Sequence, residues 1–97
     1  MSLAVCPGSF DPVTLGHVDV VRRARTMFDE VVVVVAHNTA KRPLLSVEQR
    51  VALVEGAVRD IGGVTVTSWD GLLADFLTRS GAQAVVKGLR GGADVDR

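Results

Sequence analysis

The feature that most restricts the fold of this chain is one run of β-branched residues. Val31 to Val35 are consecutive valines, and Ala36 extends the run. An unbroken apolar run of this length and composition is typical of a buried strand. It is far too short to cross a bilayer, which takes about 20 apolar residues. We therefore expect a strand in the middle of a sheet.

The rest of the chain alternates between apolar runs and segments with a helical period. Further strands are expected at Leu3–Cys6, Val64–Thr67 and Ala84–Val86. The helical segments carry apolar faces at Val18, Val21, Ala24 and Met27/Phe28, at Val47, Val51, Val54 and Val58, and at Leu72, Leu73, Phe76 and Leu77. Pro7-Gly8, Gly62-Gly63 and Gly81 are the expected stops, and Ser46 with Gln49 forms an expected capping box. Four strands alternating with three helices predict a single Rossmann-like α/β domain over residues 1–97, a parallel sheet with helices on both faces.

Composition excludes several classes of protein. The chain is 47% hydrophobic and 23% charged, which indicates a packed globular domain. Its 11 basic residues balance its 11 acidic ones, so we expect neither a nucleic acid nor a membrane as partner. The single Cys6 cannot form an internal disulfide, and Met1–Leu3 lacks the pattern of a secretory signal. We expect a cytoplasmic protein.

The loops after the strands are the expected position of a site, because open parallel sheets bind ligands beyond the carboxyl ends of their strands. These loops are Pro7–His17, His37–Leu45, Ser68–Gly71 and the segment from Lys87 onward. The first is longer than a connection requires and leads into a helix N-terminus, where unpaired N–H groups favour anions. In it, Gly8 could allow a close approach to a ligand, Gly16 could allow a tight entry to the helix, and His17 could donate to a phosphate.

Three segments in these loops resemble a known family. Gly8-Ser9-Phe10-Asp11-Pro12 followed by Thr14-Leu15-Gly16-His17 resembles the T/H-x-G-H signature of the nucleotidyltransferase superfamily. With Ala40-Lys41-Arg42-Pro43 and Lys87-Gly88-Leu89-Arg90, the chain is similar to the bacterial phosphopantetheine adenylyltransferases over essentially its whole length. The resemblance implies Mg²⁺-dependent transfer of AMP from ATP to 4′-phosphopantetheine, giving dephospho-coenzyme A and pyrophosphate in coenzyme A synthesis.

The same resemblance implies a role for each matching residue. Ser9 would bind the acceptor phosphate and, with the Phe10 main chain, the nucleotide. His17 would stabilise the triphosphate in the transition state, and Lys41 would bridge acceptor and nucleotide, so both are expected to be catalytic. Lys87 would hold the acceptor phosphate and Leu73 would contact the pantetheine arm, while Gly88, Leu89 and Arg90 would line the ATP site. No protein ligand is assigned to a metal, because Mg²⁺ often binds mainly through substrate phosphates.

The chain departs from the family near its end. Asp94 fits the pattern, but Val95-Asp96-Arg97 does not. Family members are longer and carry further residues of the nucleotide site, so we expect a C-terminally truncated domain whose own activity is uncertain. The family also forms hexamers, which implies a homo-oligomer.

Alternative interpretations remain at this point. Another nucleotidyltransferase, acting on nicotinamide mononucleotide or glycerol phosphate, would share the signature but not the acceptor. An inactive nucleotide-binding fragment would bind without turnover. A flavodoxin-like or response-regulator domain fits the alternation of elements but does not explain the long first loop.

Overall fold

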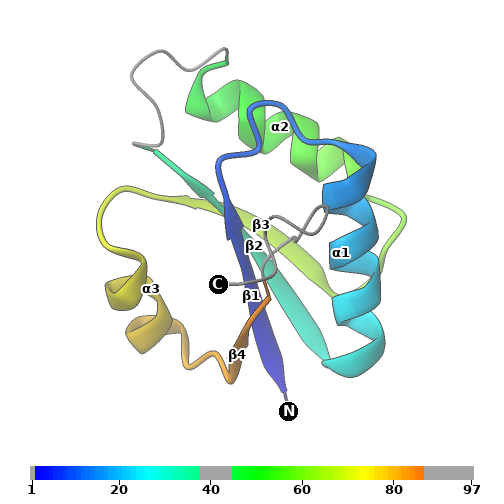
Figure 1. The fold of residues 1–97 in the computed structure, drawn as a ribbon, viewed down its shortest axis with the longest axis vertical. Coiled ribbons are helices and arrows are strands. Elements are labelled where there is room, and N and C mark those ends of the chain that lie inside the picture. The colour runs from blue at the N-terminus through cyan, green and yellow to red at the C-terminus, as the bar shows by residue number, and fades with distance from the viewer. Residues whose placement is uncertain (1, 38–44, 87–97) are drawn as a thin grey trace, which may run out of the picture.

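The computed structural model describes residues 2–37 and 45–86. Strands and helices alternate along them, as the sequence predicts. The elements are β1 (Leu3–Gly8), α1 (Leu15–Met27), β2 (Glu30–Ala36), α2 (Val47–Ala57), β3 (Val64–Trp69), α3 (Leu73–Ser80) and β4 (Ala84–Val85). The strands pair in parallel in the order β3-β2-β1-β4 (Figure 1).

Two strands continue past the ends that the sequence predicts. β1 includes Pro7 and Gly8, which pair with Val34 and Val35 of β2. Pro7 is tolerated because, among the described residues, β4 pairs with β1 at Ala4 and Val5, so that Pro7 lies beyond this pairing. β3 likewise continues through Ser68 and Trp69 in register with β2.

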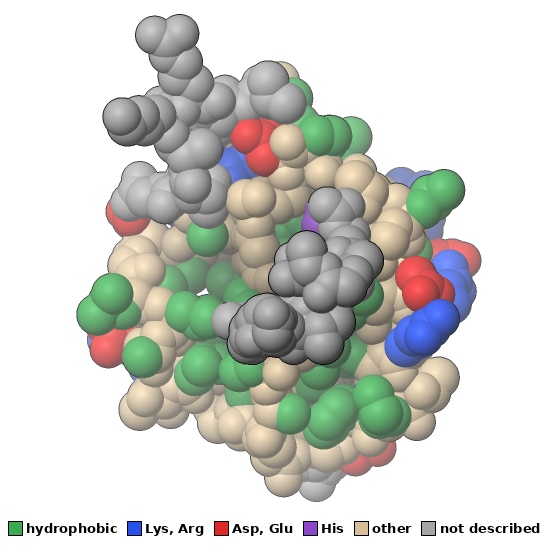
Figure 2. Space-filling view, in the orientation of Figure 1, with side chains coloured by type: hydrophobic (Ala, Val, Ile, Leu, Met, Phe, Trp, Pro, Cys, Tyr) green, Lys and Arg blue, Asp and Glu red, His purple; other side chains and the backbone are tan. Residues whose placement is uncertain are grey.

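Helices cover both faces of the sheet, as expected, but they cover them unequally (Figure 1). Val21 and Ala24 of α1 and Val54 of α2 pack on one face in a single core. That core also contains the alternate strand residues Ala4, Cys6, Val31, Val33 and Val35. On the other face lies α3, where Val85 is 39% exposed and Leu72 is 71% exposed. Figure 2 shows hydrophobic side chains in the part of the view that α3 and β4 occupy.

The helix ends follow some of the expected start and stop signals and not others. α2 begins with the predicted box, in which the Gln49 N–H donates to Ser46 Oγ and Gln49 Oε1 accepts from the Ser46 N–H. It ends at Ala57, before the expected stop at Gly62-Gly63. α3 does end at the predicted Gly81, which is left-handed with φ +73°. Met27, expected on the buried face of α1, is 66% exposed, and the C-cap residue Phe28 packs against the core instead.

The Cys6 thiol is buried in the core. Only 3% of the residue is exposed, and desolvation by burial raises the pKa of the thiol to about 11. The thiol therefore stays protonated at pH 8, and only the thiolate is nucleophilic. We predict that Cys6 resists a thiol-specific reagent at pH 8 in the native protein and reacts fully in denaturant, as mass spectrometry of the Cys6 peptide would show. Rapid native labelling would contradict this placement.

Candidate active site at the carboxyl ends of β1 and β4

The order of the strands locates the point where ligands are expected to bind. From β1 the chain proceeds outward to β2 and β3, and it then returns to the opposite side of β1 as β4. The crossovers therefore diverge to opposite faces of the sheet between β1 and β4. In open α/β sheets, the crevice at such a reversal is the usual ligand site.

The loop after β1 holds Ser9 and Phe10 in different environments. Ser9 is exposed, whereas Phe10 is 4% exposed and adopts a left-handed conformation with φ +49°. The Phe10 ring lies against Gly8, where an added Cβ would stand 3.0 Å from Phe10 Cε2. The packing of the Phe10 ring therefore explains why residue 8 is a glycine. From the sequence alone, Gly8 was assigned to the close approach of a ligand, because the position of the Phe10 ring was not known.

His17 occupies the third position of α1, where it completes a capping box with Thr14. The His17 N–H donates to Thr14 Oγ1 at 3.3 Å, and the Thr14 N–H donates to His17 Nδ1 at 2.9 Å. Thr14 therefore forms the entry to the helix, a role that was expected of Gly16. Gly16 itself lies inside the first turn. Because Nδ1 accepts this bond, the proton of the neutral imidazole is on Nε2. His17 consequently presents an N–H donor at the helix N-terminus.

The structure brings Phe10 and His17 together. Their ring centroids are 4.9 Å apart, with the rings inclined at 64°. Both line a small cavity that joins the end of β1, the first turns of α1 and the end of β4. Its other lining residues are Cys6, Pro7, Val20, Val21 and Val86.

A second cavity lies beside the first, toward α3. It measures about 80 Å³ and contains Leu73 together with Pro7, Val34, Ala36, Trp69 and Gly71. Pro7 lines both cavities, which therefore flank the end of β1. This arrangement gives Leu73 a place next to the expected site of phosphate chemistry.

Trp69 forms one wall of the second cavity and is held from several sides. Its Nε1–H donates to the Leu72 carbonyl at 2.9 Å, and its ring meets Phe76 edge to face at 5.3 Å. The Arg79 guanidinium lies 5.7 Å from the ring centroid. This position lets Trp69 pack against α3 and line the second cavity at the same time.

The remaining predicted site residues lie outside the described residues. These are Lys41 in the second loop and Lys87, Gly88, Leu89 and Arg90 after β4. Their roles stay predictions.

Sequence reasoning missed Arg50, the buried charged residue of α2. It is 1% exposed and donates to the carbonyls of Ser9, Ala36 and Leu45. Its spacing could have revealed it, because it stands three residues after Val47 and four before Val54, on the apolar face of the helix. Asp11 adds a second link between the loops, since its Oδ1 accepts the Leu45 N–H at 2.8 Å.

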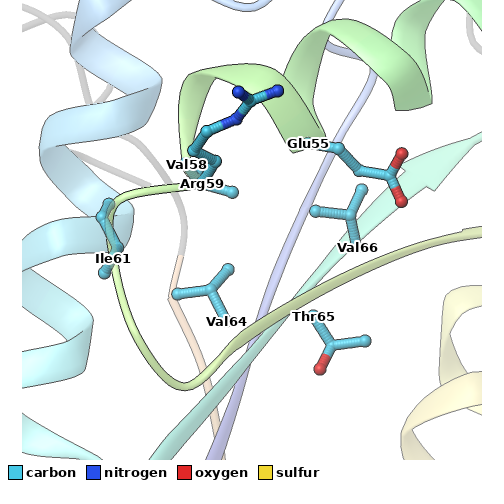
Figure 3. A pocket seen from close by; sticks show the side chains of 7 residues that line it. All are labelled: Glu55, Val58, Arg59, Ile61, Val64, Thr65 and Val66. Carbon is cyan, nitrogen blue, oxygen red and sulfur yellow. The ribbon is translucent and has the colours of Figure 1, made fainter.

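Other features of the described residues lie apart from this site. A cavity of about 350 Å³ runs between the end of α2 and the first half of β3, where Val64 and Val66 point toward the helix and Thr65 points away (Figure 3). No motif residue lines it. Within residues 2–37 and 45–86, no three His, Cys, Asp or Glu side chains gather as a metal site, and no helix is long and apolar enough to cross a membrane.

Comparison with known proteins gives the family. The sequence profile of the cytidylyltransferase-like family matches residues 5–96, which is nearly the whole chain. The chain belongs to the cytidylyltransferase-like family. This membership agrees with the nucleotidyltransferase signature in the first loop and with the observed sheet.

Relatives within the cytidylyltransferase-like family indicate a narrower group of similar proteins. The chain is 58% identical to a phosphopantetheine adenylyltransferase of Cutibacterium acnes, over 96% of this chain and 59% of the relative. It is 53% identical to that of Micrococcus luteus, over 99% and 62% of the two chains, and 49% identical to that of Rubrobacter xylanophilus, over 99% and 58%. The chain thus spans about three fifths of the length of these relatives.

A solved structure supports the fold of this cytidylyltransferase-like chain. The crystal structure of a lipopolysaccharide core biosynthesis protein from Thermoplasma volcanium superposes with a TM-score of 0.69. The match covers 88% of this chain and 72% of that one, at 24% sequence identity. At this identity the likeness establishes the fold alone.

Proposed function

We propose that the whole protein transfers AMP from ATP to 4′-phosphopantetheine, giving dephospho-coenzyme A and pyrophosphate. The observation that carries the proposal is the identity of 49% to 58% with three phosphopantetheine adenylyltransferases over at least 96% of this chain. The geometry supports it, because a small cavity lined by His17 and apolar side chains and a second apolar cavity containing Leu73 flank the end of β1. His17 offers a hydrogen-bond donor to a phosphate, and the cavity containing Leu73 offers apolar contact to the pantetheine arm.

The proposed reaction is a direct displacement. An oxygen of the acceptor phosphate forms a bond to the α-phosphorus of ATP, the bond from that phosphorus to the β-phosphate oxygen breaks, and pyrophosphate leaves. The enzyme supplies no covalent nucleophile, so its contribution is positioning and charge stabilisation. The His17 Nε2–H donates to a phosphate oxygen where negative charge develops, and the Thr14 N–H keeps the ring in the required tautomer.

The residues in the loops after β1, β2 and β4 hold the reactants in this proposal. Ser9 and the main chain of Phe10 contact the acceptor phosphate and the nucleotide. Lys41 bridges the two substrates, and Lys87 anchors the acceptor phosphate as a mobile point charge. Gly88, Leu89 and Arg90 line the nucleotide site, where the planar guanidinium suits a fixed phosphate oxygen pair.

The second cavity is the proposed place of the pantetheine arm. Its walls, Val34, Ala36, Leu73 and the Trp69 ring, offer apolar contact to the carbon chain. The contacts of Trp69 with α3 fix this wall before the ligand arrives. A preformed wall reduces the entropy lost on binding.

Mg²⁺ is proposed to accompany ATP rather than to occupy a protein cage. The described residues bring no cluster of carboxylates or imidazoles together for it. Bound to the phosphates, Mg²⁺ would neutralise charge on the pyrophosphate that leaves. The chain's own donors then need only orient the phosphates.

We further propose that the protein is cytoplasmic and that the complete polypeptide assembles as a homo-oligomer, a hexamer by family resemblance. Coenzyme A synthesis is the setting that the relatives' names imply. Light scattering of the whole protein would give the mass of the assembly, and a monomeric mass would overturn the proposed assembly.

Acceptor and nucleotide choice test the proposed function. We would measure pyrophosphate release by the full gene product with ATP or CTP, against 4′-phosphopantetheine, nicotinamide mononucleotide and glycerol phosphate. Release only with ATP and 4′-phosphopantetheine is expected. Release with another acceptor would retain the family and overturn the proposed substrate. If none of the acceptors gives pyrophosphate, the protein is a binding module.

A further inference from the structure

Arg50 is buried at a point where the loops around the site converge. It lies in the first turns of α2 with 1% of its surface exposed. A buried guanidinium is costly unless its donors are satisfied. Within the described residues, the donors of Arg50 meet main-chain carbonyls, so the side chain organises backbone.

Three segments receive these hydrogen bonds. Arg50 Nη1 donates to the Ser9 carbonyl at 3.0 Å and to the Ala36 carbonyl at 2.9 Å, and Nε donates to the Leu45 carbonyl at 3.2 Å. One side chain thus joins the loop after β1, the last residue of β2 and the entry to α2. The first of these contacts bears on the proposed function.

The bond to the Ser9 carbonyl fixes more than one atom. A peptide unit is planar, and in the trans form its N–H points opposite to its C=O. The Ser9–Phe10 unit is trans. Holding the Ser9 oxygen toward Arg50 therefore directs the Phe10 N–H away from Arg50.

The conformation of Phe10 shows why such a hold is needed. Its φ of +49° is uncommon for a residue with a side chain and persists only where surrounding contacts determine it. The Phe10 ring is enclosed by Gly8 and His17, and the Arg50 bond secures the peptide that precedes it. On the following side, Asp11 is tied to Leu45.

We propose that Arg50 is a positioning residue for the nucleotide site, which sets the plane of the Ser9–Phe10 peptide by binding the Ser9 carbonyl. This inference rests on the proposed function, in which Ser9 and the Phe10 main chain contact the nucleotide. Arg50 touches neither substrate. It acts through the Ser9–Phe10 backbone, which contacts the nucleotide.

The test compares Arg50→Lys and Arg50→Met in the full-length protein. Lysine keeps the charge and can still reach a carbonyl, whereas methionine keeps the apolar length and loses every donor. Because small misplacements of a reacting group cost up to about 100-fold in rate, we expect kcat/KM for ATP to fall about 100-fold in Arg50→Met and about tenfold in Arg50→Lys. The loss should appear largely in KM for ATP, and lysine should restore part of it.

Arg25→Lys is the matched control. Arg25 also donates to two carbonyls, those of Gly62 and Phe28, but it does so at the end of α1, near the amino-terminal ends of β2 and β3. Its replacement should lower the melting temperature and leave KM for ATP and kcat unchanged. The control separates the general effect of losing an arginine that binds carbonyls from the specific effect of losing Arg50 beside the site.

The outcomes distinguish this inference from the proposed function. We would also measure ATP affinity by calorimetry without acceptor, so a parent that binds ATP but does not use phosphopantetheine still tests Arg50. Weakened ATP binding in the Arg50 variants, beyond that of Arg25→Lys, supports the inference. The inference would be overturned if the variants keep the parent's KM and affinity for ATP, or if they lose only a fraction of folded protein. Failure of both variants to fold, or a parent that binds no nucleotide, would also overturn it.

Discussion

Replacement of His17 by glutamine in the full-length protein should lower kcat by about 100- to 1000-fold, the usual cost of removing one donor to developing negative charge. Glutamine suits the third position of a capping box, because its side-chain oxygen can accept the Thr14 N–H as His17 Nδ1 does. The helix start should therefore survive, and the melting temperature should stay near that of the parent. Steady-state kinetics and thermal unfolding measure the two effects separately.

His17→Ala serves as the comparison, because it removes both the acceptor of the Thr14 N–H and the Nε2–H donor. It should match His17→Gln in kcat and unfold at a lower temperature, since a lost hydrogen bond costs about 1 kcal/mol. Affinity for 4′-phosphopantetheine should be largely kept in both variants. Normal turnover with a large loss of acceptor binding would show that His17 serves the acceptor and not the transferring nucleotide.

Lys87→Ala should chiefly weaken the acceptor, with KM for 4′-phosphopantetheine rising about 10- to 100-fold. A hydrogen bond to a charged group contributes about 1.5–3 kcal/mol, which corresponds to this range. Lys87→Arg should recover part of the loss, because it keeps the charge but changes the shape of the donor. Calorimetric titration with 4′-phosphopantetheine measures the effect, and parent-like affinity in Lys87→Ala would remove Lys87 from the phosphate site.

The succession of strands and helices and the parallel sheet were predictable because each strand and helix has its own local signal. The valine run from Val31 identifies β2, and the apolar spacing from Val47 to Val54 identifies α2. The ends of the strands were less predictable. Pro7 extends β1 because the pairing of β4 with β1 stops at Val5 within the described residues, a fact of strand order rather than of local sequence.

The position of an expected site residue was predictable where it follows from the residue's own element. His17 lies in the first turn of α1, as the sequence indicated, and the strand order then places that turn at the reversal. Arg50 was not predicted because its partners are distant carbonyls, of which Ser9 lies 41 residues away in the chain. Main-chain acceptors carry no side-chain signature, so only the folded chain reveals such a contact.

Product analysis of the full-length protein tests the central claim most directly. We would incubate it with ATP, Mg²⁺ and 4′-phosphopantetheine and follow dephospho-coenzyme A and pyrophosphate by mass spectrometry over time. The proposed function predicts that the two products appear in equal amounts, and that His17→Gln slows both alike. Pyrophosphate without dephospho-coenzyme A, or neither product from a folded protein that binds both substrates, would contradict it.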